Sequence, residues 1–103
     1  MNKIVFHLPD GDLASRHLAI NERGKLEPYI ARSEKIYLDL SDVISISESY
    51  SDELFGILVV KYGFEHVLSS LKIENASRPI LQSIAIVMKR RLEQVNKKNK
   101  TMA

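Results

Sequence analysis

The stretch that organises this chain is residues 36–56, which read IYLDLSDVISISESYSDELFG. Its first five residues are rich in branched and aromatic side chains and predict a strand, and a second short extended piece follows at residues 43–46. A helix is then predicted through Tyr62, ending at Gly63, a residue suited to a left-handed C-terminal cap. Apolar side chains surround most of this helix, so we expect it to lie buried against a sheet. Gly56 within it would allow close approach to a strand backbone.

The segment before this stretch predicts a strand, a turn and a helix. Residues 3–6 favour an edge strand, and the sequence PDGD at residues 9–12 favours a tight turn. Ser15 can cap a helix over residues 16–31, in which one Gly and one Pro predict a kink or a division into two short helices. In the alternative, residues 13–20 form the second arm of a hairpin, because the turn permits it and the helical periodicity is poor.

The segment after this stretch predicts one more strand and a long final helix. Residues 66–75 contain the strand, most clearly at residues 71–73. Ser77, with Pro79 just inside the first turn, opens the helix. Strands that alternate with helices indicate an α/β sandwich with a small, mixed, mostly parallel sheet and helices packed on it.

Charge is distributed unevenly along the 103 residues. Residues 1–88 carry nine basic and twelve acidic residues, whereas residues 89–103 carry six basic residues and one acidic residue. Between residues 36 and 60 there are five carboxylates and no Lys or Arg, a composition unsuited to binding phosphate backbones. We therefore expect a single domain over residues 1–96 and a flexible basic tail over residues 97–103, and we expect any nucleic-acid contact to come from that tail.

The residue types argue against several chemistries. There is no Cys, and His7, His17 and His66 are far apart, so neither a disulfide nor a zinc site is expected. No nucleophile motif, glycine-rich dinucleotide fingerprint or P-loop occurs. The longest nearly apolar stretch, residues 54–60, is much shorter than the ~20 residues of a membrane span, and the N-terminus does not resemble a signal peptide. We expect a cytoplasmic protein with no catalytic residues, no metal and no cofactor.

Asp39 is the polar residue of the first strand in the central stretch. It could be grouped with Asp42 and Glu48 as ligands for Mg²⁺, which prefers several convergent oxygens. Because Asp39 alternates with leucines on a strand, we instead expect it to accept a hydrogen bond from a loop amide or to pair with a base such as Arg16.

The central stretch resembles the core motif of STAS domains, the sulphate-transporter and anti-sigma-factor-antagonist domains. The resemblance rests on LDLSDV at residues 38–43, ISES at residues 46–49 and DELFG at residues 52–56. It is closer to the bacterial STAS-like family of unknown function. Weaker matches upstream and downstream extend the resemblance from Leu13 to about Leu92.

The resemblance implies a regulatory site at the turn before the central helix. In anti-sigma-factor antagonists, a serine at this turn is phosphorylated by an ATP-binding kinase, and the phosphate decides which partner is bound. Matching motif to motif puts Ser49 at that phospho-acceptor position. Ser47 stands where the antagonists usually have Asp, and Glu48 and Tyr50 flank Ser49 where Ser and Gly are usual. The implied partner-binding or regulatory surface comprises Ser47, Glu48, Ser49, Tyr50, Asp52 and Glu53. The expected supporting residues are Ser15, Arg16 and Asp39.

Ser49 also has a purely structural interpretation, because Ser49 and Asp52 have the spacing of a helix-capping box. A cap alone, and a cap that is also a regulatory site, both remain open. We interpret the chain as a non-enzymatic protein-binding or regulatory module whose partner is an ATP-binding kinase or an anti-sigma-like regulator. The alternatives are a small nucleic-acid-associated protein acting through the basic tail, and a nucleotide-binding regulatory domain that uses the helix N-terminus at Ser49 as an anion site.

Overall fold

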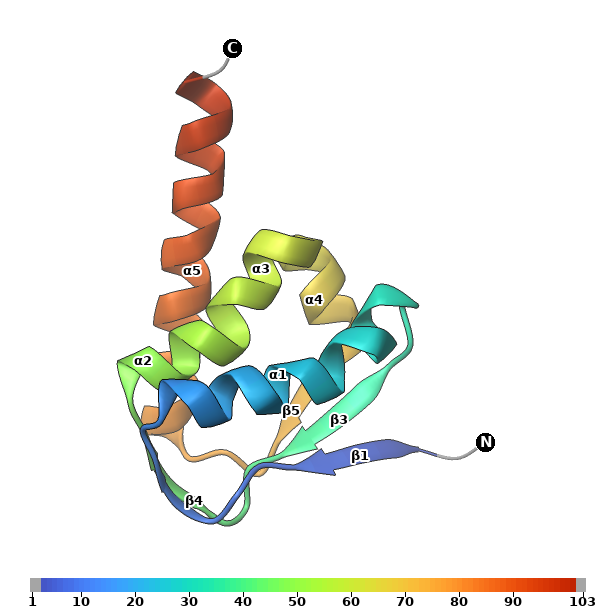
Figure 1. Ribbon diagram of the computed structural model, residues 1–103, viewed down its shortest axis with the longest axis vertical. Coiled ribbons are helices and arrows are strands. Elements are labelled where there is room, and N and C mark those ends of the chain that lie inside the picture. The colour runs from blue at the N-terminus through green and yellow to red at the C-terminus, as the bar shows by residue number, and fades with distance from the viewer. Residues whose placement is uncertain (1–2, 102–103) are drawn as a thin grey trace.

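A computed structural model describes the backbone of residues 3–101 and the side chains of residues 3–98. Strands and helices alternate along the chain (Figure 1). The strands are β1 (Ile4–His7), β2 (Gly11–Leu13), β3 (Ile36–Asp39), β4 (Val43–Ile46) and β5 (Leu71–Glu74). The helical elements are α1 (Arg16–Ala31), α2 (Glu48–Ser51), the π-helical segment η1 (Asp52–Gly56), α3 (Ile57–Tyr62), α4 (Phe64–Ser70) and α5 (Arg78–Thr101).

The strands form two small sheets, and all the strand pairs in the described residues are parallel. One sheet has the order β1-β3-β5, and the other consists of β2 and β4. In β3, Ile36 and Leu38 are fully buried, whereas Tyr37 and Asp39 on the other face are partly exposed. Figure 1 shows the strands at one end of the molecule, with α1, α3 and α4 above them. The predicted α/β class with a parallel sheet and packed helices is confirmed, and β1 is the predicted edge strand.

Helix α1 begins where the sequence predicts. The Ser15 hydroxyl accepts a hydrogen bond from the backbone N–H of Leu18 at 3.2 Å, as an N-cap does. The predicted division into two short helices is wrong, because one helix runs past Gly24 and contains Pro28. The hairpin alternative is also wrong: β2 pairs in parallel with β4, so the turn after β1 leads to a second sheet and not back along the first.

The central helix is continuous from Glu48 to Tyr62 through α2, η1 and α3. It is buried as predicted, and its nearest neighbouring helices include α1 and α5. Gly56 is correspondingly close to α5. A Cβ atom at this position would lie 3.0 Å from Cγ of Arg91 and would overlap the Asp52 carboxylate. The expected contact between Gly56 and a strand backbone is therefore wrong, because the close approach is between two helices.

The central helix ends as predicted at Gly63, whose φ of +90° disfavours any side chain. Residues 66–70, which were included in the segment expected to hold the next strand, belong instead to α4. The His66 ring is held at 2.6 Å from the backbone oxygen of Ile30, which ties α4 to α1. Strand β5 follows immediately and includes the three residues that predicted it most clearly.

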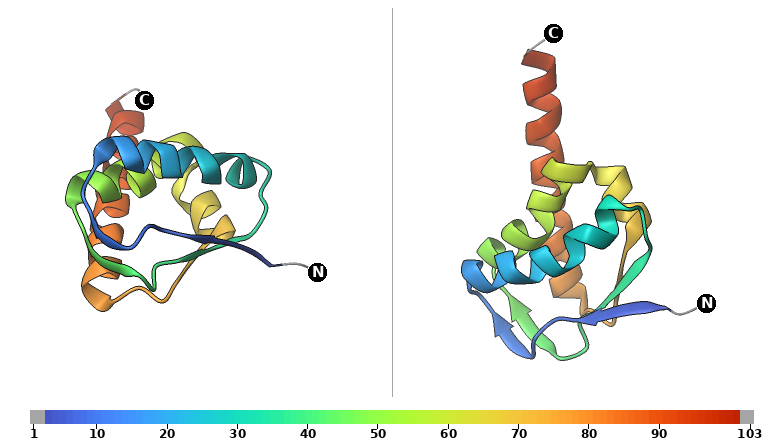
Figure 2. Two further views of the ribbon diagram at one scale, coloured as in Figure 1. Left: turned by 60° about the horizontal axis from the view of Figure 1, so that its bottom comes forward. Right: turned by 45° about the vertical axis from the view of Figure 1, so that its right-hand side comes forward.

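Helix α5 is the longest element and extends beyond the other helices in all the views (Figures 1 and 2). It remains helical to Thr101, so the expected start of a tail at residue 97 does not coincide with a helix end. Residues 102–103 of that expected tail lie outside the described residues, and the domain boundary stays a prediction. Within the described residues, no helix has both the length and the apolar character needed to cross a membrane.

Candidate functional site

The start of α2 is fixed by Ser47. Its hydroxyl oxygen accepts a hydrogen bond from the backbone N–H of Tyr50 at 3.0 Å and donates one to the carbonyl of Ala14 at 3.4 Å. Its own N–H bonds to the carbonyl of Leu13 at 2.8 Å, continuing the pairing between β4 and β2. Ser47 is therefore the N-cap, and the interpretation of Ser49 as the capping residue is wrong.

Ser49 lies in the first turn of α2 with its side chain exposed. The next residue, Tyr50, has the opposite environment, with 1% of its surface exposed. Tyr50 therefore belongs to the core and cannot be part of a partner-binding surface. Its hydroxyl has no hydrogen-bond partner. Burial, with a smaller contribution from the charge of Glu22, raises the pKa of Tyr50 to about 12.

Asp52 forms a bidentate ion pair with Arg91 of α5. The two carboxylate oxygens accept hydrogen bonds from Nε at 2.8 Å and from an Nη atom at 2.6 Å. The hydrogen bonds from Arg91 hold the pKa of Asp52 below its usual value, against a smaller opposing effect of burial. This pair joins the central helix to the last helix near the middle of the site.

Two further carboxylates of the site are also paired with arginines. Glu53 accepts a hydrogen bond from Arg23 at 2.8 Å and one from Arg16 at 3.3 Å, both from α1. Arg23 additionally donates to the backbone oxygen of Glu53. On the α5 side, Arg90 pairs with Glu48.

The head of the central helix is therefore a network of carboxylates neutralised by four arginines. Arg90 and Arg91 belong to the basic residues 89–103, but both are engaged in ion pairs with the central helix. Both contact carboxylates more than 35 residues away in sequence. Sequence analysis missed them, along with Arg23, because ion-pair partners on different helices leave no local spacing signal.

Asp39 lies apart from this network, at the end of β3. Its Oδ1 accepts hydrogen bonds from the backbone N–H of Ser41 at 2.8 Å and from the side-chain amide of Asn75 at 3.2 Å, and Oδ2 is 3.5 Å from Nδ1 of His7. The hydrogen bonds from Ser41, above all that of its backbone, lower the pKa of Asp39. The expected bond to a loop amide is confirmed, whereas the suggested pairing with Arg16 is wrong. Among the described residues, no His, Cys, Asp or Glu cluster could hold a metal ion.

A small hollow of about 140 Å³ opens beside Ser49. Its lining consists of Arg16 from α1, Arg90 and three residues of the central helix: Glu48, Ser49 and Asp52. The side chains of Arg16 and Arg90 are 62% and 46% exposed, so both are open to solvent beside the hollow. The structure thus brings the predicted residues Arg16, Glu48, Ser49 and Asp52 to one place.

Exposed apolar side chains lie on β4 and α5. Ile44 on β4 is 74% exposed and Ile86 on α5 is 56% exposed. Pro79 borders two shallow depressions, one shared with Ile44 and the other with Ile86 and Glu48. The head of α2 therefore combines a charged hollow with exposed apolar side chains, and one of the two depressions shares Glu48 with the hollow.

Comparison with known proteins identifies the central region of the chain. A family model described as STAS-like domain of unknown function (DUF4325) matches residues 23–81, which is more than half of the sequence. The match covers β3, β4, the central helix and β5, and leaves Ser15 and Arg16 outside it. No curated protein and no solved structure gives a significant match. The chain belongs to the family of STAS-like domains of unknown function.

Proposed function

We propose that this STAS-like domain is a non-enzymatic regulatory module that binds a protein partner through the head of α2, and that phosphorylation of Ser49 changes the affinity for that partner. The observation that carries the proposal is the position of Ser49: it is exposed and shares a hollow with the guanidinium groups of Arg16 and Arg90. The resemblance to anti-sigma-factor antagonists suggests an ATP-binding kinase or an anti-sigma-like regulator as the partner.

The surroundings of Ser49 are suited to receive a phosphate. A phosphoserine carries about −1.5 to −2 charges at neutral pH and three strong acceptor oxygens. Arginine binds such groups through two parallel N–H donors. Arg16 and Arg90 are now paired with single carboxylates, Glu53 and Glu48, and a dianionic phosphate would compete for both.

The carboxylates near Ser49 do not present a uniformly repulsive field. Asp52 is held by Arg91, and the main partner of Glu53 is the enclosed Arg23. A phosphate on Ser49 could therefore take over Arg16 and Arg90 while Asp52 and Glu53 keep their strongest partners. The expected change is a local exchange of ion pairs that releases Glu48 from Arg90. This exchange alters the charge of the surface at the head of α2 that is proposed to bind the partner.

The two alternative functions are less well supported by the geometry. Two of the six cations of the basic C-terminal segment, Arg90 and Arg91, are engaged with carboxylates, which reduces the charge available to a nucleic acid. The hollow at Ser49 has a volume of about 140 Å³, whereas small-molecule sites are usually about 300–1,000 Å³, so it is small for a nucleotide.

The proposal is tested by purifying the protein from its native host and analysing it by mass spectrometry. We expect a phosphate on Ser49 in part of the population and a protein partner whose recovery differs between the modified and unmodified forms. Ser69→Ala, which removes an exposed serine of α4, is the matched control and should leave partner recovery unchanged. Equal recovery with the parent protein, Ser49→Ala and Ser49→Asp would argue against the proposal.

A further inference from the structure

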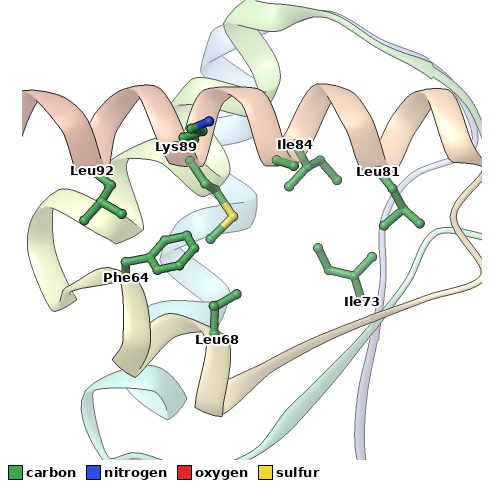
Figure 3. Close-up of a pocket in the computed structure, with 9 residues that line it drawn as sticks. Phe64, Leu68, Ile73, Leu81, Ile84, Lys89 and Leu92 are labelled. Atoms are coloured by element: carbon green, nitrogen blue, oxygen red, sulfur yellow. The ribbon is translucent and has the colours of Figure 1, made fainter.

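A second surface lies on the side of α5 that faces α4 and β5, away from Arg90 and Arg91. It is a groove of about 370 Å³ (Figure 3). Leu81, Met88 and Leu92 of α5 form one wall, and Phe64 and Leu68 of α4 form the other. The only charged side chain among its lining residues is Lys89. Leu68 and Leu81 are 46% and 44% exposed, so the apolar lining is open to solvent.

We propose that this groove binds an amphipathic helix of another protein, with acidic residues on the flank that faces α5. The apolar residues of the α5 wall are Leu81, Ala85, Met88 and Leu92, whose spacing of four, three and four residues is that of a helix seam that packs against a second helix. From Leu81 to Leu92 the seam is about 16 Å long, or three helical turns. Phe64 and Leu68, four residues apart on α4, supply apolar contacts on the opposite side.

The charges beside the seam argue against a second copy of this chain as the occupant. The exposed positions that flank the seam on α5 are Gln82, Lys89 and Asn96. On the other flank, Ile84 is buried and Arg91 is paired with Asp52. Pairing two copies of α5 along the seam would therefore bring only neutral and positive flanking residues together, in either orientation. Coiled-coil partners are selected by opposite charges at these positions.

The same charges indicate the chemistry of the partner. An acidic residue beside the apolar stripe of the incoming helix would face Lys89. On the other wall, Glu65 follows Phe64 along α4, and its negative charge would repel an acidic residue of the partner. Acidic residues of the partner are therefore expected on the α5 side only. This inference is independent of the proposed role of Ser49, because the groove and the hollow share no lining residue.

The test measures binding of fluorescein-labelled synthetic peptides to the full chain. Each peptide forms a helix of about four turns. One peptide carries leucines at the four-three-four spacing with Glu on one flank, the second has Lys in place of Glu, and the third is a scrambled sequence. Anisotropy should show saturable binding of the Glu peptide and, for the Lys peptide, binding at least about tenfold weaker. Lys89→Glu should reverse this preference. Non-specific hydrophobic binding of the peptides to the groove would not give this result.

Groove variants locate the binding. Leu68→Gln should weaken binding of the Glu peptide by at least about tenfold. Ile86→Gln, which alters an exposed apolar residue of α5 outside the groove, should leave this binding unchanged. Circular dichroism verifies folding of each variant, and Lys89→Glu tests the proposal by itself because it changes only a surface charge. The proposal is overturned if no peptide binds, if the Glu and Lys peptides bind equally, or if sedimentation shows a dimer that Leu68→Gln dissociates.

Discussion

Asp52 of the central helix and Arg91 of α5 form a two-fold hydrogen-bonded ion pair, with donor–acceptor distances of 2.8 and 2.6 Å, in the space that a side chain at Gly56 would occupy. The absence of a Cβ at Gly56 lets the carboxylate and the Arg91 stem pass close to the helix backbone. Asp52 is the first residue of the π-helical segment, a form that often marks functional positions in helices. Packing of α5 on the central helix and the charge balance of the candidate site therefore depend on one another.

Gly56→Val tests this packing. The added side chain must displace the Asp52 carboxylate or Arg91, so we expect a loss of about 1–3 kcal/mol of unfolding free energy, the usual range for overpacking. The matched control is Gly24→Ala in α1, where a Cβ meets nothing within 4 Å. It should stabilise the fold by roughly 0.5–1 kcal/mol through helix propensity. Equal melting temperatures for Gly56→Val and the parent protein would contradict the assignment of a close helix contact.

The Asp52–Arg91 pair also predicts a pH dependence of stability. Since the pKa of Asp52 is lower in the folded protein than in the unfolded chain, the stabilisation it provides is complete above the unfolded pKa of about 3.9 and is lost as the pH falls through the lower, folded pKa. Asp52→Asn should be less stable than the parent protein at pH 7, and the difference should shrink below about pH 4. Urea unfolding of both proteins at several pH values measures this. A difference that is constant from pH 7 to pH 3 would show that the charge is not involved.

The capping assignment is tested by two serine substitutions two residues apart. Ser47→Ala removes the side chain that accepts from the Tyr50 N–H, and should cost about 1 kcal/mol of unfolding free energy. Ser49→Ala removes an exposed hydroxyl and should change stability by less than about 0.5 kcal/mol. Chemical denaturation measures the unfolding free energy of both variants. A larger loss of unfolding free energy for Ser49→Ala than for Ser47→Ala would show that Ser49 is the capping residue.

Tyr50→Phe should be neutral or stabilising. The Tyr50 hydroxyl is buried without a partner, and a buried polar group that is left unpaired costs about 1–3 kcal/mol. Removing it keeps the ring in the core at nearly the same volume. Thermal melting of the variant measures the effect, with a clear drop in melting temperature as the result that would reveal an unrecognised hydrogen bond.

The parts of the fold that could be predicted from sequence are those with local signals. The β-rich run of β3, the Ser15 cap of α1 and the helix end at Gly63 each depend on a few neighbouring residues. The choice between Ser47 and Ser49 as the cap could not be made in this way, because both serines precede the same apolar helix. The hydrogen bond between the Ser47 N–H and the Leu13 carbonyl decides it, and that bond exists only once β2 lies beside β4.

The candidate site was predictable only in part, for a similar reason. The motif identified Glu48, Ser49, Asp52 and Glu53, but the acidic character expected of that stretch disappears when the arginines of α1 and α5 are in place. The close approach of the central helix to α5 could not be predicted, because an apolar helix of this length carries no signal for which element lies against each of its faces. Its π-helical segment and its close contact with Arg91 have no sequence signal apart from the glycine.

The most direct test of the proposed regulation is the dissociation constant of the partner recovered with the native protein, measured by calorimetry for unmodified protein and for protein that carries phosphoserine at position 49. The Arg16→Gln and Arg90→Gln variants are measured in both states. We predict that the phosphate changes the dissociation constant by at least about tenfold, or about 1.4 kcal/mol, and that the double substitution of Arg16 and Arg90 removes most of this change. The same dissociation constant with and without the phosphate would contradict a regulatory role for Ser49.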